Sequence, residues 1–86
     1  MVAKYIIFQV NTVGHVSFHA LVFSQFLKHS QMANPQIGVP VSAGLCTIEG
    51  GFDKDVKVSV HGVAHSLNLE SQLKDAHIIH QQIIGA

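Results

Sequence analysis

The chain has 86 residues, enough for one domain over residues 1–86, and 48% of them are hydrophobic while only 12% are charged. It contains no arginine, and five lysines balance five acidic residues, so the formal net charge is zero and no basic surface for nucleic acid is expected. The longest apolar runs fall short of the ~20 residues that cross a membrane, so no membrane contact is expected either.

Residues 4–10 are predicted to form a strand that is apolar on both faces except at Gln9, which indicates a central position in a sheet. Residues 11–14 have turn composition, and Gly14 allows a positive φ. Residues 15–20 alternate between apolar and polar side chains, as in a strand with one wetter face. The apolar face is Val16, Phe18 and Ala20, and the polar face is His15, Ser17 and His19. These two strands predict a hairpin.

Residues 21–32 lose this alternation. Phe23, Phe26 and Leu27 have the i, i+3, i+4 spacing of a short helix, and Ser30 is expected to cap a separate final turn. Residues 34–38 are predicted to be a loop, because Pro35 disfavours helical backbone at the residue before it.

Residues 39–48 and 56–60 are predicted to form a second hairpin around a turn at residues 50–55. Pro40 lacks an amide hydrogen and suits a strand start or an edge. Val56, Val58 and Val60 are expected on the core side. Gly62 is interpreted as a possible bulge, and residues 63–69 are expected to continue extended. One face of that extension would hold Val63, His65, Leu67 and Leu69.

Residues 72–84 have helical periodicity, with Ser71 as the expected N-cap and Gly85 as the stop. The predicted inner stripe is Leu73, Ala76, His77, His80, Ile83 and Ile84, with Ile79 beside it. The predicted outer side is Lys74, Asp75, Gln81 and Gln82. The expected fold class is α+β in two layers. A small antiparallel or mixed sheet of about four to five strands is packed by a C-terminal helix, with an optional short helix in the middle.

Histidine is the abundant titratable side chain, with seven copies. His15 and His19 share a strand face, and His61 and His65 have the same spacing. Adjacent hairpins bring strand residues together, so these four are the candidate ligand-binding residues. The alternative is that the polar faces use histidine in place of lysine or arginine. No metal and no cofactor is predicted, because neither His-Glu-x-x-His nor Cys-x-x-Cys spacing occurs.

Cys46 is the single cysteine and lies in an apolar run, which is typical of a small core residue. No disulfide within the chain is possible, and no signal peptide is recognised at the start, so a cytoplasmic location is expected. A compact hydrolase remains a further alternative. It would use Ser66 or Cys46 as the nucleophile with His61 or His65 as the base.

Several short segments carry a resemblance over about two-thirds of the chain, from His29 to Ile84. They are His29-Ser30-Gln31-Met32-Ala33, Pro40-Val41-Ser42-Ala43-Gly44, Gly62, Ser66-Leu67-Asn68-Leu69-Glu70-Ser71 and Asp75-Ala76. In this order the chain resembles small proteins encoded by bacteriophages and mobile bacterial DNA. Those proteins tend to carry Glu and Ser after the glycine and Arg after the second Ser, where this chain has Val63, Ala64 and Gln72.

The resemblance supplies an origin and no mechanism. Small proteins of such origin often bind a host protein or form compact oligomers. The low charge and apolar excess of this chain agree with that, because exposed apolar surface usually marks a partner. The expected function is therefore a non-enzymatic interaction module, a homodimer or larger assembly with a host protein as a possible partner. The alternative is a small-ligand or metal-binding protein that uses the histidines on its sheet face.

Overall fold

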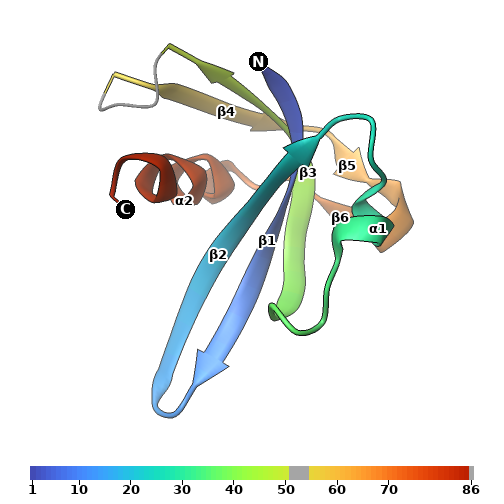
Figure 1. The fold of residues 1–86 in the computed structure, drawn as a ribbon, viewed down its shortest axis with the longest axis vertical. Coiled ribbons are helices and arrows are strands. Elements are labelled where there is room, and N and C mark those ends of the chain that lie inside the picture. The colour runs from blue at the N-terminus through green and yellow to red at the C-terminus, as the bar shows by residue number, and fades with distance from the viewer. Residues whose placement is uncertain (51–54, 86) are drawn as a thin grey trace.

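The computed structural model describes residues 1–50 and 55–85 and has a four-stranded antiparallel sheet at its centre (Figure 1). The strands are β1 (Val2–Thr12), β2 (His15–Ser24), β3 (Val39–Glu49) and β4 (Lys57–His61), in the order β2-β1-β3-β4. A small two-stranded sheet pairs β5 (Val63–Ala64) with β6 (Leu69–Glu70). The helices are α1 (His29–Met32), the 3-10 helix η1 (His65–Leu67) and α2 (Leu73–Ile84). The predicted α+β class and both predicted hairpins are confirmed.

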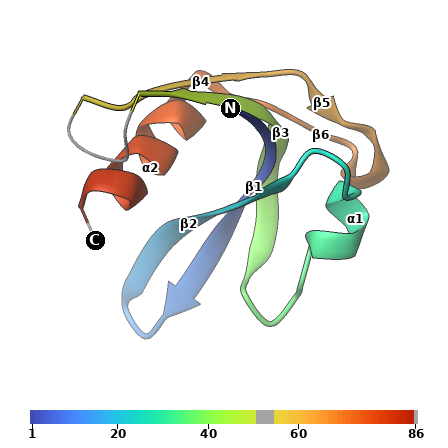
Figure 2. The ribbon, with the colours of Figure 1, turned by 45° about the horizontal axis from the view of Figure 1, so that its top comes forward.

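β1 lies between β2 and β3, so it is an inner strand as the sequence predicts. Other elements cover both faces of the sheet (Figure 2). α2 packs on one face and contacts β2 and β4. The opposite face is covered by four short elements, α1, η1, β5 and β6, of which β5 and β6 contact β3. This second cover is an addition to the two layers expected from the sequence, and it gives the sheet two separate hydrophobic clusters.

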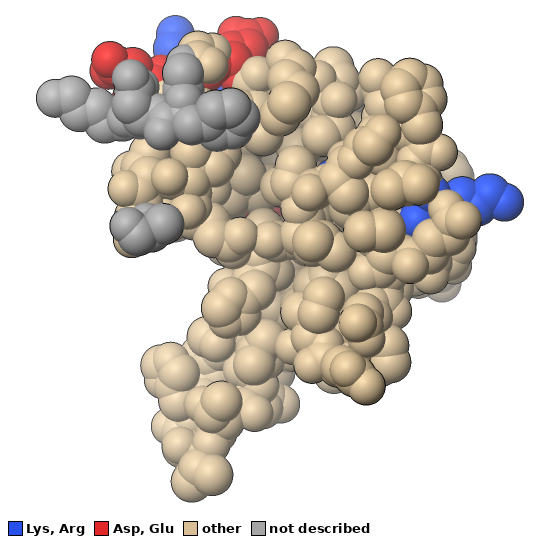
Figure 3. All heavy atoms as spheres, viewed as in Figure 1, with Lys and Arg blue, Asp and Glu red and all other residues tan. Residues whose placement is uncertain are grey.

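β1 and β2 continue beyond the rest of the sheet as a two-stranded arm, residues 10–17 (Figure 1). The pairing of β1 with β3 ends at Gln9, whereas the pairing with β2 runs on to Thr12 and His15. Gly14 has φ +73° in the turn, as predicted. Figure 3 shows the arm as a projecting finger without a lysine, arginine, aspartate or glutamate atom. The arm is therefore a neutral extension of the sheet.

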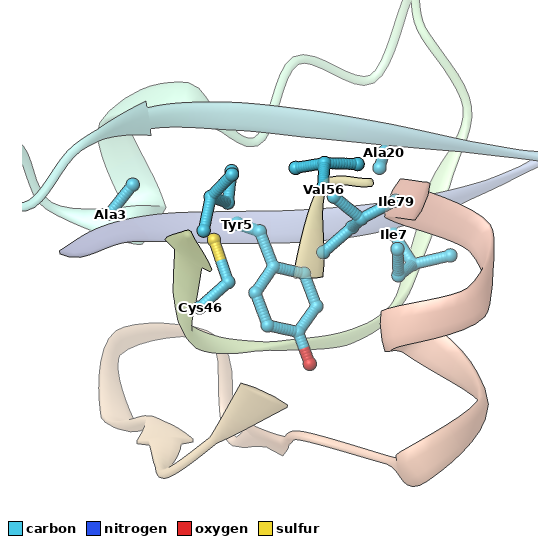
Figure 4. Packing of buried hydrophobic residues seen from close by; sticks show 8 residues of the cluster. Ala3, Tyr5, Ile7, Ala20, Cys46, Val56 and Ile79 are labelled. Atoms are coloured by element: carbon cyan, nitrogen blue, oxygen red, sulfur yellow. The ribbon is translucent and has the colours of Figure 1, made fainter. Parts of the chain in front are cut away.

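The first hydrophobic cluster lies between the sheet and α2 (Figure 4). Its buried members are Ala3, Tyr5, Ile7, Ala20, Cys46, Ile48, Val56 and Ile79. The prediction that Cys46 is a core residue is confirmed. Val58 and Val60 also pack against this cluster, so the predicted core side of the β4 hairpin is confirmed.

The second cluster lies on the other face of the sheet and takes the alternate residues of β1. Its buried members are Ile6, Phe8, Phe23, Ala43 and Ala64. Met32 of α1, Leu67 of η1 and Leu69 of β6 pack against it. These short elements therefore have a hydrophobic reason to lie on the sheet, although none of them is long enough to be stable alone.

The predicted helix over residues 21–32 is wrong in its first half. β2 continues to Ser24, which pairs with Ala3, and Phe23 is buried in the second cluster. Strand pairing with β1 prevails over the helical spacing because both faces of β2 find apolar partners there. Ser30 lies inside α1 and is not its cap; the Lys28 amide instead donates to the Gln31 side chain at 2.9 Å.

The extended segment predicted over residues 63–69 is also wrong. Only two short strands form there, because η1 intervenes and Asn68 takes a left-handed conformation with φ 55°. Gly62, with φ +81°, separates β4 from β5 where a bulge was expected. Of the turn predicted at residues 50–55, residues 51–54 lie outside the described residues.

The start of α2 is held by a buried carboxylate, that of Asp75. The prediction of Asp75 on the outer side of the helix is wrong, since it is 0% exposed. Its Oδ2 accepts the Tyr5 hydroxyl at 2.6 Å and the Gln72 amide at 3.0 Å, and its Oδ1 accepts the Ser42 hydroxyl at 2.9 Å. Gln72 is therefore the N-cap residue rather than the predicted Ser71.

Because Asp75 faces the sheet, the side of α2 that faces inward differs from the side predicted from the sequence. Leu73, predicted inside, is 91% exposed, whereas Ile79, predicted beside the stripe, is buried. Burial of three hydroxyl and carboxylate groups is tolerated because each of them has a hydrogen-bond partner. Figure 4 shows the Tyr5 side chain crossing the first cluster with its hydroxyl at the far end from β1.

Burial, together with the hydrogen bond and the negative charge of Asp75, raises the pKa of Tyr5 far above its ordinary value. Folded Tyr5 therefore keeps its proton at a pH where the unfolded chain, with an ordinary tyrosine pKa of about 10, releases it. Above about pH 10 the unfolded state binds fewer protons than the folded state, so stability falls as pH rises. The contribution is fully present below that pH.

We expect Tyr5→Phe to lower the free energy of unfolding by about 1–2 kcal/mol at pH 7 and to flatten its decline above about pH 10. Urea unfolding across that range measures both effects. Tyr5 is the only tyrosine, so the ultraviolet absorbance of tyrosinate reports its ionisation directly. Tyrosinate absorbance that rises near pH 10 while the protein is still folded would contradict the prediction.

Ser42→Ala is the matched control. It removes the other hydroxyl on Asp75 and is expected to cost about 1 kcal/mol. The variant keeps the titrating phenol, so the steep decline of stability at alkaline pH should stay as in the parent protein.

Candidate functional site

The outer strand β2 presents an unprotected edge of the sheet. It is 10 residues long and contains no lysine, aspartate, glutamate or proline. Sheets usually protect an outer strand with charges, prolines, bulges or short length. β4, the other outer strand, has 5 residues and begins with Lys57 paired opposite Glu49. The two edges therefore differ, and β2 is the one suited to pair with a further strand.

Gln82 of α2 occupies this edge at one residue, Ala20. The Gln82 side-chain oxygen accepts the Ala20 amide at 2.7 Å, and its side-chain nitrogen donates to the Ala20 carbonyl at 2.7 Å. These are the two bonds that a neighbouring strand would make. In the part of the chain that the structure describes, no other side chain bonds to the backbone of β2. The side-chain amide therefore caps the edge near the middle of the strand.

The backbone groups of Val16 and Phe18 point to the same outer side as those of Ala20, because backbone direction alternates along an unbroken register. Both side chains are substantially exposed, Val16 at 53% and Phe18 at 42%. Val13 at the tip of the arm is fully exposed. The free end of β2 thus combines outward backbone groups with apolar side chains.

The structure separates the histidines that the sequence indicates as ligands. His15 and His19 lie on one face of β2, as the alternation predicts, whereas His61 ends β4 and His65 begins η1. β2 and β4 are the two outer strands, about 14 Å apart at the usual spacing between strands. The two pairs therefore do not form one cluster, contrary to expectation. Ligand binding by any one of the four stays a prediction.

A hollow of about 250 Å³ lies on the sheet face away from α2, where α1 and η1 meet. Its lining consists of Lys4, Lys28, His29, Leu45, Val63, His65 and Ser66. Of the four predicted histidines, His65 alone borders it. The sequence analysis did not identify the other polar lining residues, because Lys4, Lys28 and His29 have no spacing typical of a binding motif.

His29 is buried at the base of this region. Its Nε2 lies 2.9 Å from the Gly44 carbonyl oxygen, and its ring meets Phe23 edge to face at 5.5 Å. A carbonyl only accepts, so Nε2 carries the hydrogen and donates it. His29 thus ties α1 to β3, and its hydrogen bond is a structural role that the sequence analysis did not identify.

The geometry of the described residues does not assemble a metal site, and neither of the predicted nucleophiles, Cys46 and Ser66, has a histidine hydrogen-bond partner there. Among the described residues, no three histidine, cysteine, aspartate or glutamate side chains are placed to hold a metal ion. Cys46 is fully buried, and burial raises the pKa of its thiol, which disfavours the reactive thiolate. The Ser66 hydroxyl oxygen accepts the Ser30 amide at 3.1 Å. These contacts give no geometric support to the hydrolase alternative.

Comparison with known proteins finds no family model, no curated protein and no solved structure that matches the chain. In residues 1–50 and 55–85 the longest helix is α2, whose 12 residues are too few to cross a bilayer.

Removal of the Gln82 side chain tests its role at the edge. We expect Gln82→Ala to lower the free energy of unfolding by about 1–3 kcal/mol, because two backbone groups lose their partners. The variant should also self-associate more strongly, because the whole of β2 then becomes available for pairing. Chemical denaturation and sedimentation velocity measure the two effects.

Gln81→Ala is the control for this variant. It removes the same side chain from the adjacent, exposed position of α2 and leaves both bonds to Ala20 in place. Equal self-association of the two variants would contradict the role given to Gln82.

Proposed function

We propose that the protein is an interaction module that associates with a second copy of itself by antiparallel pairing of β2. The observation that supports this most is the outward backbone of Val16 and Phe18 on an uncharged outer strand, beside an Ala20 that Gln82 already occupies. A strand of another protein could use the same bonds. A second copy is the better partner because the same short segment is complementary to itself about a two-fold axis.

Gln82 limits the register of this pairing. With Ala20 occupied, the segment left for a partner on the arm side of Gln82, where Val16 and Phe18 are exposed, is His15 to His19. A two-fold axis at Ser17 places Val16 opposite Phe18 of the second copy, and each such pair exchanges two backbone hydrogen bonds. Val16 and Phe18 face the side of the sheet that carries α2, so each exposed side chain would cover the other across the axis.

The size of the interface predicts weak association. Five residues from each copy bury less than the ~1,200–2,000 Å² of a stable protein interface. A dissociation constant on the order of micromolar or weaker is therefore expected.

Val16→Lys tests the proposal, because a lysine at this position introduces charge repulsion at the centre of the pairing. Sedimentation velocity over a series of concentrations should show a monomer–dimer equilibrium for the parent protein and a monomer for the variant. Val39→Lys is the matched control, since Val39 is 61% exposed on β3, away from β2. A parent protein that stays monomeric, or a Val16→Lys dimer as strong as the control, would refute the proposal.

The same register predicts a dependence on pH. His15 would face His19 of the second copy in a close pair without backbone bonds, twice in each dimer. Imidazoles in general gain a proton as pH falls through about 6.5, and like charges directly opposite destabilise a strand pair. We expect association at pH 5 to be about 2- to 30-fold weaker than at pH 7.5.

His19→Gln should remove this pH dependence while it keeps the dimer at pH 7.5. The nearby titratable and charged groups from α2 are His77, beside Phe18 and His19, and Lys74, whose ammonium lies 5.7 Å from the Phe18 ring centre. His77→Gln is therefore the control and should keep the pH dependence. An acid effect lost with His77 rather than His19 would assign it to α2.

The origin and the compartment are part of this proposal. The segments quoted above support an origin in bacteriophage or mobile bacterial DNA, where small interaction proteins are common. A single cysteine held reduced in the core, Cys46, suits the cytoplasm.

A further inference from the structure

We propose that the hollow between α1 and η1 binds the phosphate group of a small phosphorylated molecule. Every titratable side chain that lines it is basic, and they come from three separate parts of the chain. Lys4 lies on β1, Lys28 and His29 lie at the start of α1, and His65 lies on η1. In a protein with net charge zero, this collection without an acidic neighbour in the lining is a local excess of positive charge.

Two hydrogen bonds hold donor groups at the hollow. The Lys4 ammonium donates to the Leu27 carbonyl at 2.8 Å, which fixes the amine and leaves two of its three hydrogens for a ligand. The Ser66 hydroxyl oxygen accepts the Ser30 amide at 3.1 Å, so its own hydrogen is free to be donated. A partly buried, oriented ammonium binds an anion better than a freely moving one, because less side-chain entropy is lost on binding.

The placement of the described charged residues favours an anion at this place. Figure 3 shows lysine atoms without acidic atoms beside them at one end of the molecule, whereas at the opposite end acidic atoms lie together with a further lysine. Among the described acids, Glu49 and Asp55 lie at the turn end of the β3–β4 hairpin, and Asp75 is buried on the other face of the sheet. Glu70 lies on β6 opposite Val63 and is not part of the lining. No acidic side chain in the described lining therefore cancels the two lysines.

The size and walls of the hollow indicate the class of ligand. About 250 Å³ is less than the ~300–1,000 Å³ of pockets for drug-sized molecules, so the ligand is small. Leu45 and Val63 give one apolar wall, which suits a short organic group attached to the phosphate. A phosphate carries more charge than a carboxylate and matches two ammonium groups better. Lysine binds phosphate as a point charge without the bidentate geometry of arginine, so modest affinity is expected.

Titration of the full-length protein with glycerol phosphate, inorganic phosphate and acetate at constant ionic strength tests the proposal. The titration is followed by NMR. The ring signals of His29 and His65 should shift with saturation for glycerol phosphate and, more weakly, for inorganic phosphate. Acetate should produce little change. Shifts that never saturate, or that spread over all seven histidines, would indicate non-specific screening and overturn the proposal. Equal binding of acetate would overturn the phosphate assignment.

Lys28→Gln and Lys4→Gln are expected to weaken binding about tenfold or more, because each removes a charged donor. Lys57→Gln on β4 removes the same charge outside the hollow and should change the affinity less than twofold. Lys28 is exposed, so its replacement leaves the core unchanged and tests binding even if the Lys4 variant is unstable. Equal affinity for Lys28→Gln and Lys57→Gln would overturn the proposal.

This site is independent of self-association. The hollow is lined by β1, α1, β3, β5 and η1 and includes no residue of β2. Val16→Lys should therefore bind glycerol phosphate as the parent protein does, and the two proposals succeed or fail separately.

Discussion

The buried carboxylate of Asp75 is the constraint on which the rest of the structure depends. A buried charge is costly unless it is fully hydrogen-bonded, and Asp75 meets that condition with groups from β1, β3 and its own helix start. The bonds from Tyr5 and Ser42 join α2 to two strands of the sheet, whereas the bond from Gln72 is local to the helix start. Hydrophobic contacts alone are less directional, so the network selects the orientation of α2, and the apolar residues of the first cluster then pack around it.

The position of α2 in turn determines which part of β2 is covered. Gln82 follows Asp75 by seven residues, two turns later on nearly the same side of the helix, and so reaches the sheet edge at Ala20. α2 ends at Ile84, and the arm of residues 10–17 extends beyond β3. The middle of the edge is therefore closed by a side chain while its end keeps outward backbone groups. One buried hydrogen-bond network and one surface amide together determine which backbone groups of β2 are covered.

The strands with a regular pattern of apolar residues could be predicted from the sequence. The alternation of residues 15–20 and 56–60 identified β2 and β4, and the apolar run of residues 4–10 identified a central strand. Residues 21–23 were missed because they are all apolar, with Val22 packed against the first cluster and Leu21 and Phe23 in the second, so they do not alternate. Asp75 was missed because its partners Tyr5 and Ser42 lie 70 and 33 residues away in the chain. The hollow was missed for the same reason, since Lys4 and His65 meet only through the fold.

The few charged residues of the chain are unevenly distributed in the structure. Two of its five lysines line one hollow, whereas the ten residues of β2 include no lysine, aspartate or glutamate. An anion in the hollow would be held largely by electrostatic attraction, which salt weakens, whereas strand pairing rests on backbone hydrogen bonds and apolar contact, which salt affects little. The two surfaces therefore respond to different physical variables. If both proposals hold, a small domain with few charges would keep a binding site and an association edge without one disturbing the other.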